Sequence, residues 1–209
     1  MGYNSEKQFE DDLVKMLSEQ KGWKDGILNY KTEKELIRNW ADILYENNRS
    51  IDRLGDYPLT DGEMEQILEQ IRALKTPLRL NGFINGGTVQ ITRDNEADEH
   101  NFGKLVSLKI FDRNEIAAGK TRYQIARQPK FSAKNDIYPD RRGDFCLLIN
   151  GMPVIHVELK KSMVPISEAQ YQICKYLHEG VFYRIILIGS DICGDESGGV
   201  CIFCQSGKL

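Results

Sequence analysis

The sequence predicts an α/β protein with a mixed central β-sheet flanked by helices and a helical N-terminal third. Apolar residues recur at helical spacing up to about residue 74 and at a period near two afterwards. A near-continuous β-branched run over 154–159 is typical of a central strand, and one clear helix follows it. The pattern also fits an α+β arrangement, and we take α/β as the fold class.

Three helices are expected in the first third of the chain. Apolar stripes at helical spacing run through 9–17 and 36–45. A third helix is expected over 61–74, where Pro58 and Pro77 bracket the apolar face. This part is expected to be mainly helical as far as residue 76.

The remainder, 77–209, is expected to form a mixed-sheet core within a single domain of 1–209. Alternating apolar patterns predict strands over 89–91, 105–111, 122–125, Phe145–Ile149, 154–159, 181–188 and Val200–Phe203. The helix Ile166–His178 is expected to begin with Ser167 as N-cap and to end at Gly180.

Composition excludes several classes of protein. Hydrophobic residues make up 41% and charged residues 28%, a balance typical of a globular domain. No apolar run approaches the length of a membrane span, and the polar N-terminus does not resemble a signal peptide. The five cysteines are odd in number and lie within apolar patterns, which indicates a reduced, cytoplasmic protein.

Charge is unevenly distributed although the net charge is only −3. Residues 1–70 hold 9 basic and 16 acidic side chains, whereas residues 103–142 hold 10 basic and 4 acidic ones. A basic block can follow the phosphates of a nucleic acid, and a solvated strand face is the alternative.

The residues that carry chemistry lie at the edges of two apolar strands. Asp144 precedes one strand, and Glu158 and Lys160 close the next, where a spacing of two places them on one face. Two converging carboxylates suit a hard ion such as Mg²⁺, and a lysine beside them can hold water or a phosphate oxygen. A surface ion pair at the strand ends is the alternative.

The loop between these strands sets a geometric test. With a regular two-residue turn at Asn150-Gly151, Asp144 and Glu158 would point to opposite faces of the sheet. An odd loop or a β-bulge would bring them to the same face, so the metal site requires one or the other.

Further candidates surround this group. Gln172 and Tyr176 are four residues apart and share a helix face, and Glu10 borders the buried face of the first helix. Lys130 and Arg142 are candidate phosphate contacts. His156 shares the strand face of Glu158, where a hydrogen-bonded core histidine is favoured over a metal ligand.

Asp144-x13-Glu158-Leu-Lys160 followed by Gln172-x3-Tyr176 resembles the PD-(D/E)xK nuclease superfamily, in its RecB-like branch. Arg142-Gly-Asp144, the phrase Asn-Gly-Met-Pro-Val and the early Phe-Glu10 helix resemble the N-terminal endonuclease region of a type I restriction enzyme R subunit. The resemblance covers roughly 6–203. The family often has proline where Gly143 stands, a difference expected to leave the metal site unaffected.

The resemblance implies a restriction-endonuclease-like core that hydrolyses phosphodiester bonds of double-stranded DNA with Mg²⁺, for which Mn²⁺ can substitute. Asp144, Glu158 and the backbone carbonyl of Leu159 would bind the metal, and Lys160 would orient the attacking water or steady the phosphate. Glu10 would assist through a water on the metal. Gln172 and Tyr176 would hold DNA phosphate or position the lysine.

The resemblance further implies modification and specificity subunits as partners, and ATP use only in a motor region outside this sequence. The chain would then be a fragment of a longer motor subunit. Two alternatives stay open. One is a structure-specific or RecB-like nuclease, and the other is a non-catalytic scaffold that binds DNA or docks a subunit.

Overall fold

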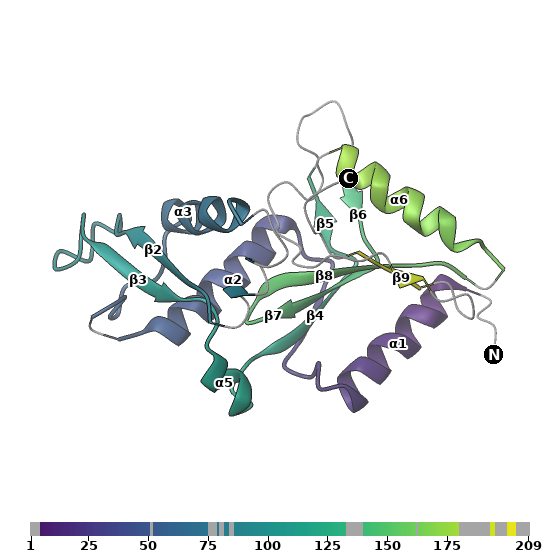
Figure 1. The fold of residues 1–209 in the computed structure, drawn as a ribbon, viewed down its shortest axis with the longest axis horizontal. Coiled ribbons are helices and arrows are strands. Elements are labelled where there is room, and N and C mark those ends of the chain that lie inside the picture. Colours follow the sequence, from purple (N-terminus) through teal and green to yellow (C-terminus); the bar gives the residue numbers. More distant parts are fainter. Residues whose placement is uncertain are drawn as a thin grey trace.

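The computed structural model describes residues 5–50, 52–74, 79, 82–83, 86–132, 140–161, 163–179, 193–194 and 200–203. Within these residues a six-stranded sheet has the order β1-β4-β7-β8-β10-β9 (Figure 1). Its strands are Ile27–Asn29 (β1), Tyr123–Arg127 (β4), Phe145–Ile149 (β7), Met152–Leu159 (β8), Cys193–Gly194 (β9) and Val200–Phe203 (β10). β1 is parallel to β4 and the other pairs are antiparallel. The predicted α/β class with a mixed sheet is confirmed.

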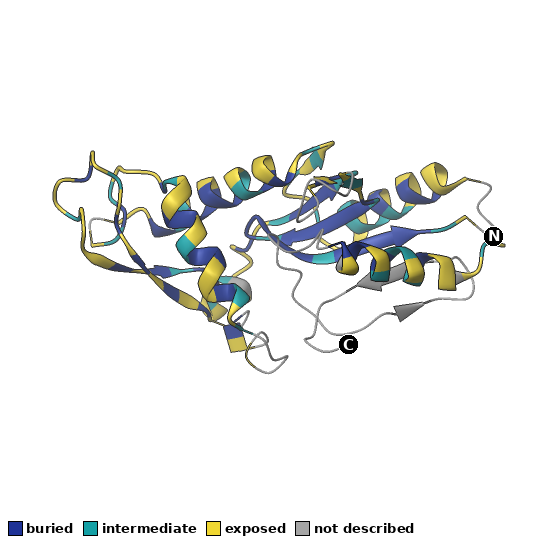
Figure 2. Ribbon diagram, turned by 90° about the horizontal axis from the view of Figure 1, so that it is seen from above, coloured by how far each residue is buried: buried dark blue, intermediate teal, exposed yellow. Residues whose placement is uncertain are grey.

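Helices cover both faces of this sheet. The first helix, Glu6–Gln20 (α1), packs on one face, and Glu33–Asn48 (α2) and Ile166–His178 (α6) pack on the other (Figure 1). The central strands are therefore buried on both sides, and the helices are buried on their inner faces only (Figure 2). This two-sided burial explains why the sequence of β8 is a continuous apolar run instead of an alternating one.

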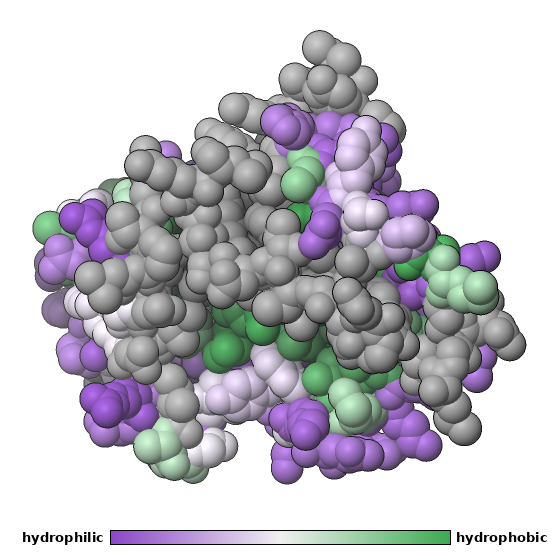
Figure 3. Space-filling view, turned by 45° about the vertical axis from the view of Figure 1, so that its right-hand side comes forward, coloured by the Kyte–Doolittle hydropathy of each residue, from purple (hydrophilic) through white to green (hydrophobic). Residues whose placement is uncertain are grey.

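Side chains of β7 alternate between the two faces of the sheet. Phe145 and Leu147 pack against α1, whereas Cys146 and Leu148 pack against α2 and α6. In the view of Figure 3, apolar side chains are gathered in the lower middle of the face, and hydrophilic ones lie along its left and lower margins. Any residue can thus be assigned to the α1 side or the α6 side of the sheet from its place along the strand.

A second core lies beside the sheet. Helix Asp61–Arg72 (α3) packs on a hairpin of Thr88–Thr92 (β2) and Leu105–Lys109 (β3), and α2 contributes to the same core (Figure 1). At its edge the buried guanidinium of Arg93 binds the carboxylates of Glu63 and Asp98 at 2.8 and 3.2 Å. These buried charges are compensated by each other, which makes the three residues interdependent.

The β7–β8 hairpin confirms the predicted bulge. Asn150 and Gly151 form a two-residue turn with φ of 50° and 83°, and Ile149 pairs with Met152. The register then shifts, because Leu148 pairs with Pro153 but Leu147 pairs with Ile155. Val154 is the extra residue of the bulge. Phe145 consequently pairs with Val157, and one step further along the register Asp144 lies opposite Glu158.

Some expected details differ. Helix α6 begins at Ile166, so Ser167 lies in its first turn and is not the N-cap. The reason is Pro165, whose fixed φ starts the turn early and whose carbonyl accepts from the Glu168 N–H. The strand expected over 181–188 and the helix end at Gly180 lie outside the described residues.

Short elements complete the fold. Lys130–Phe131 (β5) pairs with Arg141–Arg142 (β6), and Arg113–Ala117 (α5) is a single short helix. In the part of the chain that the structure describes, no helix has the length and apolar character needed to span a membrane.

Candidate active site

Asp144 lies between β6 and β7, and its carboxylate is held against the end of β8. The backbone N–H of Leu159 donates to Asp144 Oδ2 at 2.6 Å, and the N–H of Gln128 donates to the Asp144 carbonyl at 2.7 Å. Burial and the nearby Glu158 carboxylate raise the pKa of Asp144 to about 7, against the opposing effects of the Leu159 N–H and the Lys160 ammonium. The two carboxylates and the lysine are therefore close enough to interact.

Glu158 is fully buried on the α6 side of β8, and donors hold both its oxygens. His156 Nε2 lies 2.6 Å from Oε1, and Gln172 Nε2 donates to Oε2 at 2.8 Å. His156 is itself buried, with Nδ1 3.3 Å from Cys146 Sγ. Burial opposes the charged ring, but Cys146 and Glu158 outweigh it and raise the pKa of His156 to about 10. His156 is thus the hydrogen-bonded core histidine that the sequence predicts.

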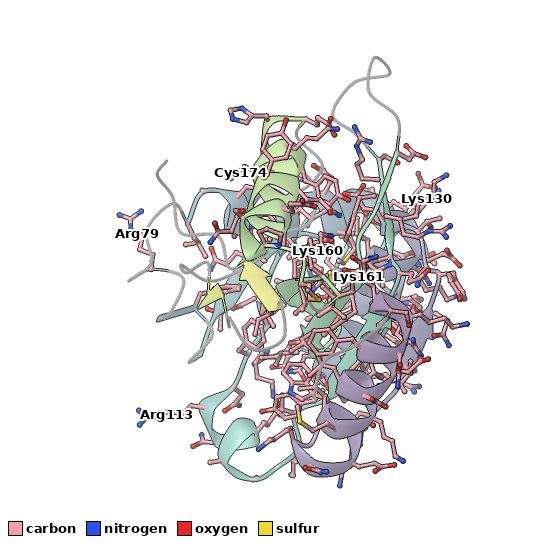
Figure 4. The ribbon with its side chains drawn as sticks, turned by 90° about the vertical axis from the view of Figure 1, so that its right-hand side faces the viewer. Arg79, Arg113, Lys130, Lys160, Lys161 and Cys174 are labelled. Atoms are coloured by element: carbon pink, nitrogen blue, oxygen red, sulfur yellow. The ribbon has the colours of Figure 1, made fainter. Side chains whose placement is uncertain are left out.

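Lys160 follows β8 and turns back towards α6. Its ammonium donates to Gln172 Oε1 at 2.8 Å, while Gln172 Nε2 also donates to the Tyr176 hydroxyl at 2.7 Å. That hydroxyl donates to the carbonyl of Arg142 at 3.3 Å. Burial and the charge of Glu158 raise the pKa of Tyr176 to about 12, so its proton is retained. Figure 4 shows Lys160 beside α6, with Lys161 next to it.

The donor set fits a hard divalent cation. Two carboxylates that repel each other in a buried setting are stabilised when a cation lies between them. Within the described ranges, no three His, Cys, Asp or Glu side chains are grouped as a metal site. Mg²⁺ commonly takes one or two protein carboxylates and keeps several waters, so Asp144, Glu158 and the Leu159 carbonyl are the oxygen donors that could hold such an ion.

Glu10 is buried on the α1 side of the sheet, opposite to Glu158. Its Oε1 accepts from Arg127 Nε at 2.7 Å and its Oε2 from Gln128 Nε2 at 3.2 Å. Gln128 has a φ of 48° and also contacts the backbone of Asp144, so it links Glu10 to the end of β7. Glu10 therefore approaches the candidate site through Gln128.

Lys130 and Arg142 lie directly opposite each other on β5 and β6. Like charges in this position repel, and each of the two side chains contacts a different residue instead. Lys130 Nζ is 2.8 Å from the Asp140 carboxylate, and the Arg142 guanidinium lies 5.8 Å from the ring centre of Tyr30. Figure 4 places Lys130 at the outer edge of the molecule, away from Lys160.

A cavity of about 640 Å³ opens beside Lys160 along α6. Its lining residues are Arg141, Lys160, Ser167, Glu168, Tyr171, Gln172, Lys175 and Tyr176. Three of these side chains are basic and one is acidic. The Tyr171 side chain is exposed, whereas the Arg141 guanidinium is fixed by Glu179 with two contacts of 2.6 Å. The cavity is continuous with Lys160, Gln172 and Tyr176 and has a net positive lining.

Sequence reasoning missed three neighbours of the candidate site. No sequence pattern indicates that Gln128 links Glu10 to Asp144. This link depends on the left-handed backbone of Gln128, which a sequence pattern does not predict. Cys146 lies two residues after Asp144, and its contact with His156 follows only from the β7–β8 register. Glu6 lies one turn before Glu10 on α1, and its negative charge also raises the pKa of Asp144.

Comparison with known proteins gives a consistent result. The family model for the type I restriction enzyme R protein N terminus matches residues 3–186. The chain is 30% identical over 176 residues to the endonuclease subunit of a type I restriction enzyme of Staphylococcus aureus (strain MSSA476). It is equally similar to the corresponding subunit of Staphylococcus saprophyticus. The match covers 84% of this chain and 17% of each relative.

Proposed function

The chain belongs to the family of type I restriction enzyme R protein N termini, and from that premise we propose that it is a metal-dependent endonuclease domain acting on double-stranded DNA. The observation that carries the proposal is the bulge in the β7–β8 hairpin, because it sets Asp144 opposite Glu158. The proposed core is restriction-endonuclease-like. Its proposed partners are the modification and specificity subunits of the restriction complex, and ATP would be used only in the motor region.

The proposed metal is Mg²⁺, with Mn²⁺ as a substitute. Asp144, Glu158 and the Leu159 carbonyl would hold it. A bound divalent ion would acidify a water molecule and neutralise charge on the scissile phosphate. The buried setting strengthens these interactions, because few waters screen the charges.

Lys160 is proposed as the positive group that faces the phosphate in the transition state, where its charge opposes the developing negative charge. Gln172 holds the ammonium of Lys160 and the carboxylate of Glu158 at once, through the two ends of one amide. Tyr176 fixes that amide in turn. We therefore propose that Gln172 and Tyr176 position Lys160. We propose that Glu10 supports the backbone at Asp144, through its contact with Gln128.

The cavity along α6 is the proposed path of the DNA strand that is cut. It begins at Lys160 and carries further basic side chains at Lys175 and Arg141. The exposed ring of Tyr171 offers a surface for a sugar or a base. Lys130 and Arg142 would contact phosphates on the β5–β6 side.

Removal of metal tests the proposal directly. Cleavage of plasmid DNA by the full subunit, assembled with its partner subunits, should require Mg²⁺ or Mn²⁺ and stop in EDTA. The 209-residue chain should bind Mn²⁺, and the Glu158→Gln variant should not, because one of the two carboxylates is lost. Cleavage that persists in EDTA, or Mn²⁺ binding unchanged in that variant, would contradict the proposal.

The phosphate contacts can be tested apart from cleavage. Arg142→Ala should weaken binding of the 209-residue chain to duplex DNA in Ca²⁺. The slope of log affinity against log salt should become shallower by about 0.9, the value for one lost phosphate contact. Arg38→Ala is the matched control, since Arg38 is an exposed arginine on α2 paired with Asp42. Equal slopes for Arg142→Ala and the unmodified chain would remove Arg142 from the interface.

A further inference from the structure

His156 occupies a site from which its ring cannot turn. On β8 it precedes Glu158 by two residues on the same face, and across the sheet it pairs directly with Cys146. Its two nitrogens contact Cys146 and Glu158. The rings of Phe131 and Tyr176 lie edge-on, with centroids at 6.0 and 6.4 Å. The imidazole is fully buried, so water cannot replace any of these contacts.

Gly143 closes the remaining side of this site. A Cβ atom at residue 143 would lie 2.2 Å from His156 Cε1, and 3.2 Å from each ring nitrogen. A Cβ contact of 2.2 Å does not occur in real structures, so any larger residue at 143 requires the imidazole or the backbone of residue 143 to shift. Gly143 does not have the positive φ that favours glycine, and the space for His156 is therefore what requires it. Glycine at this position was expected to leave the metal site unaffected. That expectation stays a prediction, and the structure places residue 143 against the ring that contacts Glu158.

We infer that His156 is a positioning residue for Glu158, and that the absence of a side chain at Gly143 leaves room for the imidazole to make this contact. An ionised carboxylate can only accept hydrogen bonds, so Nε2–H of His156 is the donor in this contact whatever the state of Nδ1. Together with the amide of Gln172 it fixes both oxygens of Glu158, and with them the direction in which the carboxylate faces Asp144. This inference rests on the proposed function, since it assigns Glu158 to the metal.

Mn²⁺ affinity of the 209-residue chain, measured by the electron paramagnetic resonance of free Mn²⁺, tests this role. His156→Leu fills the site without a donor and should weaken Mn²⁺ binding about 10- to 100-fold, the usual effect of losing a residue that orients a metal ligand. His156→Gln places an amide N–H near the position of Nε2 and should bind within a few-fold of the unmodified chain. A merely structural role would affect both variants equally. Circular dichroism and thermal unfolding identify a variant that fails to fold.

A double-mutant cycle tests the link to Gly143. Gly143→Ala alone should weaken Mn²⁺ binding to a similar extent as His156→Leu, because the new Cβ displaces the ring. In a His156→Ala background the same change should have little further effect, since the space is then open. Equal losses in both backgrounds would mean that Gly143 acts through the backbone of Asp144 and would overturn its assigned role.

A second readout needs no metal. The ¹⁵N resonance of His156 Nε2 should shift in Glu158→Gln and in Gly143→Ala, because both changes alter the same hydrogen bond. An unmodified chain that binds no Mn²⁺ would overturn the proposed function while these shifts still report the contact. If the unmodified chain binds Mn²⁺ and the affinity falls equally in His156→Leu and His156→Gln, the positioning role alone is overturned.

Discussion

Replacing Lys160 with alanine is expected to reduce DNA cleavage on the order of 10³-fold, the usual loss when one preorganised group that faces transition-state charge is removed. The ammonium of Lys160 is held at 2.8 Å by Gln172, and its charge acts on the Asp144 carboxylate. It thus lies beside the carboxylates without being a metal ligand. Mn²⁺ affinity should accordingly change little. Plasmid cleavage by the assembled enzyme measures the effect.

The neighbouring residue provides a matched control. Lys161 is an exposed lysine one position further along the chain, and Figure 4 shows the two side by side. Lys161→Ala removes the same charge and the same number of atoms. In the proposed arrangement it is Lys160, not Lys161, that contacts Gln172. Cleavage by Lys161→Ala should therefore stay within a few-fold of that by the unmodified enzyme. ATP hydrolysis by the full subunit should be intact in both variants. Cleavage by Lys160→Ala at the level of Lys161→Ala would mean that the cutting site lies elsewhere.

The long elements of the fold could be predicted from the sequence because one pattern determines each of them. The helices around Leu36 and Ile67 and the run ending in Leu159 have apolar faces that only one secondary structure can bury. The bulge could also be predicted, because Asp144 and Glu158 lie on one face only if an extra residue is present. The requirement that the two carboxylates share a face thus predicted the β7–β8 register, which the strand propensity of the residues alone did not determine.

The elements that were missed depend on tertiary contacts. β1 has only three residues, Ile27–Asn29, and its parallel pairing with β4 is formed by residues almost a hundred positions apart. β5 and β6 have two residues each, too few for any periodicity. At the candidate site, the link from Glu10 to Asp144 runs through Gln128, whose left-handed backbone no local pattern indicates. Contacts of this kind become visible only once the sheet is assembled.

Replacing Asp144 with asparagine is expected to stabilise the metal-free protein while abolishing metal binding and cleavage. The pKa of Asp144 is raised from its usual 3.8 to about 7, so the folded state binds a proton more tightly than the unfolded chain does. The protein therefore loses stability as pH rises from about 4 to above 7, by an amount on the order of 4 kcal/mol. Asparagine carries no charge, keeps an oxygen for the Leu159 N–H, and avoids this loss.

Unfolding by denaturant at pH 5 and pH 8, with EDTA or Mg²⁺, measures this effect. At pH 5 the asparagine variant should have less than half of its advantage at pH 8, because the folded Asp144 is then protonated and only the unfolded chain ionises; at pH 8 in EDTA the variant should be clearly more stable. Mg²⁺ should stabilise the unmodified chain at pH 8 and leave the variant unchanged. Asp42→Asn, at an exposed carboxyl on α2, should show neither difference. If Asp144→Asn is instead less stable at pH 8 in EDTA, Asp144 serves the fold more than a cation. The repulsion between the two carboxylates would then not be what a metal relieves.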